Sequence, residues 1–252
     1  MLSKSESKIK NIKESGKYLT ELLHLVKDAV GVGVRLSYLE SIAQDYINRK
    51  GLKGAFKGYM GFPANLCLSV NDCIVHGIPD EYQLKEGDVL KIDAGIVYNG
   101  GISDSAITVI VGGDNSNQLG KELYKTTKHA LDTAMEKIAP GVPLFEYSKT
   151  IYSTMMSNDF SVIKNLTGHG VGDKVHEKPH IYNWPHPETK KIKFEKNMVL
   201  ALEPITSILS EDIKTKPGND WNLYTENEDL GAQWEYTVLV TDNGIQIISG
   251  IQ

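Results

Sequence analysis

The sequence predicts an α+β fold made of two similar halves that face each other, and three observations lead to this prediction. The 252-residue chain passes twice through the same order of predicted elements, two helices followed by a group of strands. The segments GVRL (33–36) and GVPL (141–144) occupy matching joints between those helices. No low-complexity tract or linker divides the chain. We therefore expect one domain, residues 1–252, with internal repeats at about 15–112 and 117–250.

The first half begins with two predicted helices. Apolar residues spaced three and four apart mark one face of a helix from about residue 4 to residue 30. A second helix is expected to begin at Ser37, because Ser37 and Glu40 match the S-x-x-E pattern of a capping box. It is expected to end at Gly51, since glycine is the usual residue after a helix C-terminus.

Strands follow these helices, at residues 66–70 and 74–78 and then in a β-hairpin. The hairpin is expected from the stretch 91–109, which reads as two strands around a turn, and its flanks 89–97 and 106–111 are both rich in valine and isoleucine. Its turn contains Asn99 and two glycines, residue types that reach positive φ at little cost.

The second half repeats the pattern. Helices are predicted at 118–138 and 143–157, separated by Pro140-Gly141. The predicted strands lie at 161–163, 198–203, 233–240 and 245–248.

Composition excludes several classes of protein. The net charge of −5 and the lack of a basic cluster argue against direct nucleic-acid binding. No run of about 20 apolar residues predicts a membrane helix, and the first residues lack the apolar core of a signal peptide, so we expect a cytoplasmic protein. Cys67 and Cys73 are six apart, which matches no common zinc pattern, and we expect reduced thiols.

Four carboxylates stand on otherwise apolar predicted strands. Asp93 and Asp104 lie on the two arms of the hairpin, while Glu203 and Glu235 lie on strands of the second half. Clustered carboxylates repel one another, and desolvating them is costly unless positive charge lies between them. His169, between the glycines of GHGVG, adds a neutral nitrogen ligand. Four negative charges and one imidazole suit two divalent cations about 3.5–4 Å apart, which would activate a water molecule as a nucleophile.

Seven motifs then resemble those of type I methionine aminopeptidases, in the order and at the spacings of that family. They are VHGIP (75–79), KID (91–93), SDS (103–105), GHGVG (168–172), HEKP (176–179), LEP (202–204) and QWEYT (233–237). The resemblance implies the pita-bread fold, in which two pseudo-symmetric α+β halves surround a central curved antiparallel sheet and a dinuclear metal site. It implies the reaction as well, the hydrolytic removal of the initiator methionine from nascent polypeptides with a small second residue.

The resemblance also implies a role for each ligand. Asp93 is expected to chelate one metal, Asp104 and Glu235 to bridge both, and His169 and Glu203 to complete the second. Glu203 is also expected to carry a proton from the attacking water to the leaving amine. The ligand set suits Mn²⁺, Fe²⁺, Co²⁺ or Zn²⁺.

Substrate contacts are implied at six further positions. His176 matches the histidine that donates to the scissile carbonyl oxygen, and His76 matches the one beside the scissile nitrogen and the P1′ residue. The positions that match the methionine pocket are Tyr59, Phe62, Cys67 and Trp221.

Two positions depart from the family pattern. Val175 stands where many bacterial relatives have phenylalanine, which predicts a wider pocket wall. Tyr236 stands where histidine is common, which predicts altered surroundings for the metal ligands. The interval from His169 to Glu203 is short and so is the segment before the first helix, and in this the chain resembles the minimal bacterial form of the family. The resemblance also implies a monomer that acts on nascent chains at the ribosome. Because Leu2 is bulky, the chain is expected to retain its own Met1.

Two other interpretations are open at this point. A prolidase or aminopeptidase P relative would keep the fold and change the substrate, although such proteins usually carry a large N-terminal domain. A non-catalytic binding protein could share the pita-bread fold, although such relatives tend to lose metal ligands.

Overall fold

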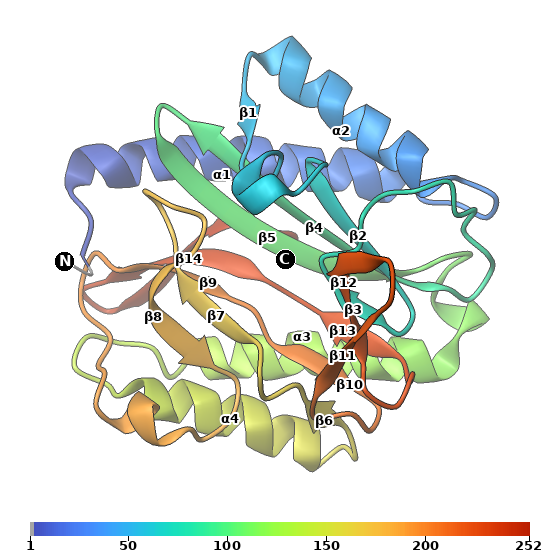
Figure 1. Cartoon of the computed structure of the whole chain (residues 1–252). Helices are drawn as coiled ribbons and strands as arrows, with labels where there is room; N and C mark the ends of the chain where they lie inside the picture. Colours follow the sequence, from blue (N-terminus) through green and yellow to red (C-terminus); the bar gives the residue numbers. More distant parts are fainter. Residues whose placement is uncertain (1–2) are drawn as a thin grey trace.

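The computed structural model describes residues 3–252, so the expectation about Met1 and Leu2 lies outside the described residues. Figure 1 shows two pairs of helices on opposite sides of the molecule, with the strands between them. Helices α1 (Glu6–Asp28) and α2 (Leu36–Lys50) cover one side, and α3 (Gln118–Met135) and α4 (Leu144–Met156) cover the other. This α+β architecture confirms the predicted fold class.

The first helix forms as its periodicity predicts. Ser5 caps α1 by accepting from Lys8 N, and the face with Ile12, Leu19 and Leu23 is fully buried against the strands. Gly51 ends α2 with a φ of 64°, in the left-handed region that glycine adopts without strain.

The predicted capping box at Ser37 is wrong. Arg35 occupies the N-cap of α2, and its side chain makes no capping hydrogen bond. Ser37 lies inside the helix, and the carboxylate of Glu40 accepts hydrogen bonds from the backbone N–H groups of Asn65 (2.9 Å) and Leu66 (3.0 Å). Glu40 therefore fixes the start of the strand at residues 66–70 instead of capping the helix, as the S-x-x-E pattern had predicted.

The strands of the first half are β1 (Lys53–Gly54), β2 (Leu66–Val70), β3 (Cys73–Val75), β4 (Val89–Tyr98) and β5 (Gly101–Ile110). Between β1 and β2 lies the 3-10 turn η1 (Tyr59–Gly61). Strands β4 and β5 form the predicted hairpin around Asn99 and Gly100, and β4 pairs with β2 on its other side. The prediction of a strand at 74–78 is wrong at its end, because His76 has a φ of 58°, which no β-strand tolerates.

The second half contains more strands than the sequence predicts. After β6 (Ser161–Val162) come two unpredicted strands, β7 (Thr167–Gly170) and β8 (Glu177–Tyr182), and the 3-10 turn η3 (Pro187–Lys190). Strand β9 (Val199–Leu202) was expected, whereas β10 (Ile205–Ser207), β11 (Ile213–Lys216) and β12 (Asn219–Thr225) were not. Another 3-10 turn, η2 (Asp114–Ser116), precedes α3.

The prediction of one strand at 233–240 is wrong, because the backbone changes its hydrogen-bond partners within this segment and forms two strands. Strand β13 (Gly231–Gln233) pairs with β10, whereas β14 (Tyr236–Thr241) pairs with β9 and β15 (Gly244–Ser249). Between them, the N–H of Glu235 donates to the carbonyl oxygen of Ala106 (2.8 Å), so the chain leaves one sheet before it enters the next. A five-stranded sheet results, in the order β15-β14-β9-β7-β8.

Matching hydrogen bonds occur at the two joints with the G-V-x-L pattern. Gly33 N donates to Leu84 O at 2.7 Å, and Gly141 N donates to Phe194 O at 2.9 Å. This correspondence supports two related halves, although the exact bounds of the repeats stay a prediction. Within the described part of the chain, no helix is long and apolar enough to cross a membrane.

Candidate metal centre and substrate cleft

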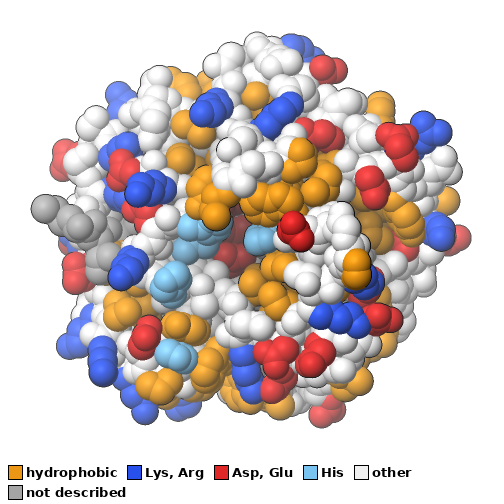
Figure 2. Space-filling model, in the orientation of Figure 1, with side chains coloured by type: hydrophobic (Ala, Val, Ile, Leu, Met, Phe, Trp, Pro, Cys, Tyr) orange, Lys and Arg blue, Asp and Glu red, His pale blue; other side chains and the backbone are white. Residues whose placement is uncertain are grey.

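A cleft of about 290 Å³ is lined by residues 56–104 of the first half and 165–235 of the second. Figure 2 shows its mouth, where histidine side chains surround a recessed acidic group and hydrophobic side chains form much of the rim. The cleft brings together every site residue that the sequence predicts. They are Tyr59, Phe62, Cys67, His76, Asp93, Asp104, His169, His176, Glu203, Trp221 and Glu235.

Strand register explains why the two aspartates meet. Asp93 on β4 lies opposite Ala106 on β5, and Asp104 lies opposite Gly95. Both carboxylates therefore project from the same face of the hairpin, one diagonal step apart. The interpretation that they face a common site across the hairpin agrees with this geometry.

The second half contributes its ligand candidates from strand ends. Glu203 directly follows β9 and Glu235 directly precedes β14, two strands that pair through Leu202 and Tyr236. His169 projects from β7. The imidazole Nε2 of His169 lies 3.4 Å from Glu203 Oε1 and 4.0 Å from Asp104 Oδ2.

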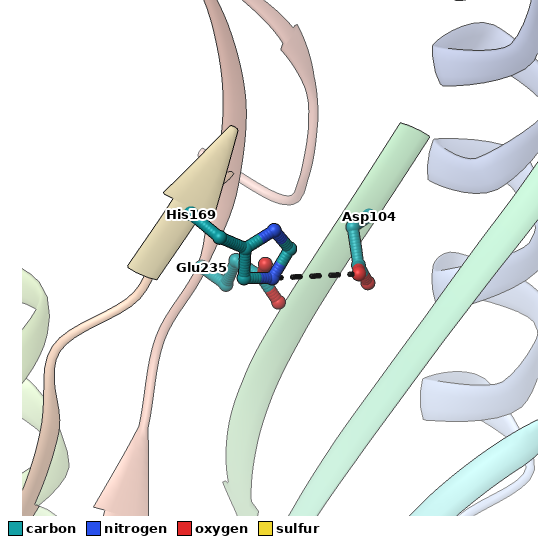
Figure 3. Close-up of side chains that lie close together, drawn as sticks. All are labelled: Asp104, His169 and Glu235. Carbon is teal, nitrogen blue, oxygen red and sulfur yellow. Dashed lines mark ion pairs between the residues drawn. The ribbon is translucent and has the colours of Figure 1, made fainter. Parts of the chain in front are cut away.

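Figure 3 shows the imidazole of His169 directed toward the carboxylates of Asp104 and Glu235. Ligand atoms of these three residues all lie within 4.8 Å of one another. The Nδ1 atom of His169 lies 3.0 Å from the carbonyl oxygen of Gly170. When Nδ1–H donates to that carbonyl, the Nε2 lone pair faces the carboxylates, which is the arrangement of a metal-binding histidine.

The four carboxylates are buried, and buried carboxylates ionise only with positive charge close by. Asp93, Asp104, Glu203 and Glu235 expose between 1% and 8% of their surface. Burial raises the pKa of Asp93 to about 7. The pKa values of Asp104, Glu203 and Glu235 are raised well above their ordinary range, chiefly by burial and in addition by repulsion between the carboxylates.

Unpaired oxygens point to what is needed at this site. Asp93 Oδ1, Asp104 Oδ1 and Glu235 Oε1 are buried and accept no hydrogen bond from the residues that the structure describes. Buried polar atoms are nearly always partnered in native proteins. A divalent cation would partner these oxygens and neutralise the cluster, so the donor set fits a metal.

Neighbouring side chains orient the candidate ligands. Asp104 N donates to Thr237 Oγ1 (2.9 Å), and the same hydroxyl donates to Asp104 O (2.6 Å). Gln233 Nε2 donates to Glu203 Oε2 at 3.2 Å. Gln233 lies within the QWEYT motif, but nothing in the motif shows that its side chain contacts Glu203.

Two further histidines line the cleft and are neutral at physiological pH. Burial, reinforced by His176, lowers the pKa of His76 to about 4. Burial and nearby His180 also lower the pKa of His176, whose Nδ1 lies 3.1 Å from the hydroxyl of Tyr59. The rings of His169 and His176 are 4.4 Å apart between centroids, so His176 lies directly beside the candidate metal site.

One wall of the cleft is apolar. Phe62 and Trp221 meet edge to face with their centroids 5.1 Å apart. Cys67 is buried beside them, and burial raises the pKa of its thiol, which keeps the sulfur protonated. Phe56 also lines this wall, where its ring packs over Gly95, and no motif in the sequence marks it as a pocket residue.

The two departures from the family pattern lie beside the cleft rather than in it. Val175 packs in the same buried apolar cluster as Phe62 and Cys67 but is absent from the described residues that line the cavity. Tyr236 is buried, and its hydroxyl donates to the carbonyl oxygen of Ile251 (3.1 Å). Tyr236 directly follows Glu235 and lies opposite Leu202 of β9.

An α+β fold with a buried carboxylate–imidazole cluster in a cleft of about 290 Å³ is the arrangement of a metal-dependent hydrolase. Residues 10–242 match metallopeptidase family M24, and the chain belongs to that family. It uses divalent metal accordingly.

Within this family, the chain is similar over its full length to methionine aminopeptidases. The chain is 36% identical over its whole length to a methionine aminopeptidase of Clostridium perfringens and covers all of that protein. It is 38% identical to a methionine aminopeptidase of Aquifex aeolicus, with 97% of each chain covered. Among solved structures, a methionine aminopeptidase from Thermotoga maritima superposes with a TM-score of 0.94 at 35% identity, over the full length of both chains.

Prolidase structures share the fold alone. Prolidase from Pyrococcus furiosus superposes with a TM-score of 0.79 at 21% identity, and this chain covers 66% of it.

Proposed function

We propose that this protein is a metal-dependent aminopeptidase that hydrolyses N-terminal methionine from nascent polypeptides with a small second residue. The observation that carries the proposal is the buried cluster of Asp104, His169 and Glu235, with unpaired carboxylate oxygens beside an apolar wall. Full-length similarity to methionine aminopeptidases supports the same substrate.

Five side chains would hold two divalent ions. Asp93 would chelate one ion, Asp104 and Glu235 would bridge the pair, and His169 and Glu203 would complete the second. When bound, the ions supply Lewis acidity that makes water a nucleophile near neutral pH. Two features support this assignment: four negative charges match four positive ones, and each proposed ligand lines the same cleft.

Glu203 would transfer the proton. Its Oε2 accepts from Gln233, while Oε1 faces His169 at 3.4 Å and is available toward the cleft. The carboxylate would accept a proton from the attacking water and pass it to the leaving amine, the role of a general base that then acts as an acid.

His176 and His76 would bind the scissile amide. When the Tyr59 hydroxyl donates to His176 Nδ1, the neutral imidazole keeps its proton on Nε2 and can donate to the carbonyl oxygen as negative charge develops there. His76 lies on the side of the cleft with Trp221, at 6.3 Å between ring centroids, and from there it would contact the scissile nitrogen and the P1′ residue.

The methionine side chain would lie against the apolar wall. Tyr59, Phe62, Cys67 and Trp221 offer aromatic faces and a protonated thiol, and Phe56 extends the same surface. Sulfur–aromatic contacts add about 0.3–1.5 kcal/mol to the burial of a thioether, so such a wall favours methionine over an aliphatic residue of equal size.

The cellular setting is also a proposal. We infer a cytoplasmic monomer that acts on chains as they leave the ribosome. The net charge of −5 supports action without direct nucleic-acid binding.

The decisive experiment measures methionine release from Met-Ala-Ser. Metal-stripped protein is assayed anaerobically before and after addition of Mn²⁺ or Co²⁺, with Asp104→Asn as the variant that lacks a bridging charge. We expect release only with metal, and a loss of about 10²-fold or more in the variant. Cleavage of Ala-Pro but not of Met-Ala-Ser would favour the prolidase alternative. Failure to bind any metal would favour the non-catalytic one.

A further inference from the structure

Three buried polar side chains cross the first sheet one step away from the proposed metal ligands. Lys91 on β4 lies opposite Ser69 on β2 and Thr108 on β5, and we call these three residues the polar row. Asp93 is two residues beyond Lys91, so the polar row shares a sheet face with the metal cluster. The exposed fractions are 2% for Ser69, 0% for Lys91 and 2% for Thr108. Fully buried lysine is rare in proteins, and the reaction proposed above uses none of these three residues.

Lys91 anchors the turn between β2 and β3. Its Nζ donates to the carbonyl oxygen of Asn71 at 2.7 Å and approaches that of Val89 at 3.4 Å. The same Asn71 carbonyl accepts a hydrogen bond from Gly231 N at 3.2 Å, at the first residue of β13. Lys91 therefore ties β4 to a turn that also holds the start of β13.

Ser69 anchors the segment that carries His76. Its hydroxyl accepts from Gly77 N at 2.9 Å, and Leu68 N donates to Gly77 O at 2.8 Å. Both bonds hold Gly77, the residue directly after His76, and the φ of 58° at His76 costs energy in a residue other than glycine. A Cβ at Gly77 would lie 2.2 Å from Leu68 O, which shows how closely this segment is held against β2.

Thr108 anchors the segment that carries Gln233 and Glu235. Its hydroxyl donates to Gln233 O at 2.7 Å and accepts from Gln233 N at 3.0 Å. Gln233 in turn donates to Glu203, and Glu235 follows two residues later. The Thr108 hydroxyl thus fixes the backbone of Gln233, whose side chain contacts Glu203 and whose segment carries Glu235.

We propose that the polar row positions the segments of His76 and of Gln233–Glu235 against the sheet that carries Asp93 and Asp104, with Lys91 as its central positioning residue. The inference rests on the proposed function, because the roles of His76 and Glu235 are assigned there. Each member of the row makes hydrogen bonds to the backbone of a different segment. Loss of one member would therefore displace the side chains that the segment carries, although the row does not contact those side chains. Displacement by about 1 Å can cost about 10²-fold in rate.

The test begins with Lys91→Met, which keeps the length of the side chain and removes its N–H donors. We expect kcat for Met-Ala-Ser to fall at least about tenfold with a smaller change in KM. We also expect the visible absorption spectrum of the Co²⁺-loaded protein to change, because the geometry of the ligands changes. The control is Lys17→Met, at an exposed lysine on α1 whose Nζ donates to Glu14 Oε1 at 2.6 Å. The control should keep both the wild-type kcat and the wild-type spectrum.

Rescue separates positioning from a general loss of stability. Lys91→Ala leaves a cavity of the shape of propylamine, so added propylamine should restore part of kcat in this variant. It should not do so in Lys91→Met, where the methionine side chain fills the space. A merely structural role would lower the melting temperature of both variants and give no such difference.

A second variant keeps the proposal falsifiable if Lys91→Met does not fold. Thr108→Val replaces a hydroxyl by a methyl group of equal size, and it should lower kcat and change the Co²⁺ spectrum in the same way. Folded variants with wild-type kcat and spectrum would overturn the proposal. If wild-type protein releases no methionine, the proposed function fails instead, and the Co²⁺ spectra of the variants still decide whether the row positions the ligands.

Discussion

Gln233 donates a hydrogen bond from Nε2 to Oε2 of Glu203 at 3.2 Å, while Oε1 of the same carboxylate lies 3.4 Å from His169 Nε2. Both residues come from the second half but from different sheets, since Gln233 ends β13 and Glu203 follows β9. The bond therefore joins two sheets at the point where the proposed proton transfer takes place.

Replacement of Gln233 by leucine should lower kcat about tenfold to a hundredfold, because Glu203 loses the donor that orients it as a general base. Steady-state rates of methionine release from Met-Ala-Ser measure the effect. Gln83→Leu, at an exposed position, is the matched control and should leave the rate unchanged. A wild-type rate in Gln233→Leu would remove this residue from the mechanism.

Metal removal should make stability depend on pH. Burial raises the pKa of Asp93 from 3.8 to about 7, so the folded metal-free protein binds this proton more tightly than the unfolded chain does. Stability is then fully present below the unfolded value and is lost as pH rises from about 4 through about 7. We expect the melting temperature of metal-free protein to be lower at pH 7.5 than at pH 5, where each 1 kcal/mol corresponds to roughly 2–4 °C for a chain of this size.

Calorimetry of the same protein saturated with Mn²⁺ provides the control for that experiment. Bound metal neutralises the carboxylates, so the fall between the two pH values should disappear. A metal-free protein equally stable at both values would show that the cluster carries no excess protons.

Tyr59→Phe should lower kcat about fivefold with little effect on KM, since a hydrogen bond of this kind contributes about 1 kcal/mol. The hydroxyl orients His176 through Nδ1, so its loss weakens the donor to the developing oxyanion and spares substrate binding. Tyr38→Phe, at a residue that is 56% exposed, controls for loss of a hydroxyl elsewhere. An unchanged kcat in Tyr59→Phe would mean that His176 is oriented without it.

Phe56→Leu should relax the preference for methionine. The Phe56 ring packs over Gly95 and closes one side of the apolar wall, so a smaller side chain enlarges the pocket. We expect kcat/KM for methionine to fall and the ratio for a longer residue such as ethionine to rise, measured on matched tripeptides. Phe145→Leu on α4 is the control. An unchanged ratio would place Phe56 outside the pocket.

Glu40→Ala should destabilise the protein by about 1–3 kcal/mol, whereas Ser37→Ala should change the free energy of unfolding by less than about 0.5 kcal/mol. The Glu40 carboxylate accepts from two backbone N–H groups at the start of β2, and the variant leaves them without partners. Urea denaturation of the two variants compares them directly. Equal losses of unfolding free energy in the two variants would favour the capping box of Ser37 and Glu40 over the contact between Glu40 and β2.

The sequence was sufficient to predict the elements that depend on local chemistry. The hairpin of β4 and β5 was predictable because valine and isoleucine flank an Asn-Gly turn, and the same pattern placed Asp93 and Asp104 where a buried charge needs a partner. Strands β7 and β8 were missed because their residues are polar and a bulge after His169 breaks the alternation that marks a strand.

Other features depend on which segments meet in space, and no local pattern reports that. The apolar run that contains Glu235 reads as one strand, yet its backbone changes partners between β13 and β14. The roles of Gln233 and Lys91 follow from hydrogen bonds to distant segments, at Glu203 and Asn71. Phe56 reads as an ordinary apolar residue until its ring is seen against Gly95 in the cleft.

Ligand candidates from both predicted halves meet at one point, with Asp93 and Asp104 before residue 112 and His169, Glu203 and Glu235 after residue 117. Ions bound there would link the two halves of the chain, and removing the ions would remove that link. Metal affinity would then be part of the folding free energy, since whatever binds only the folded state stabilises it. A cell that restricts its supply of divalent metal would shorten the lifetime of the folded protein as well as slow its reaction.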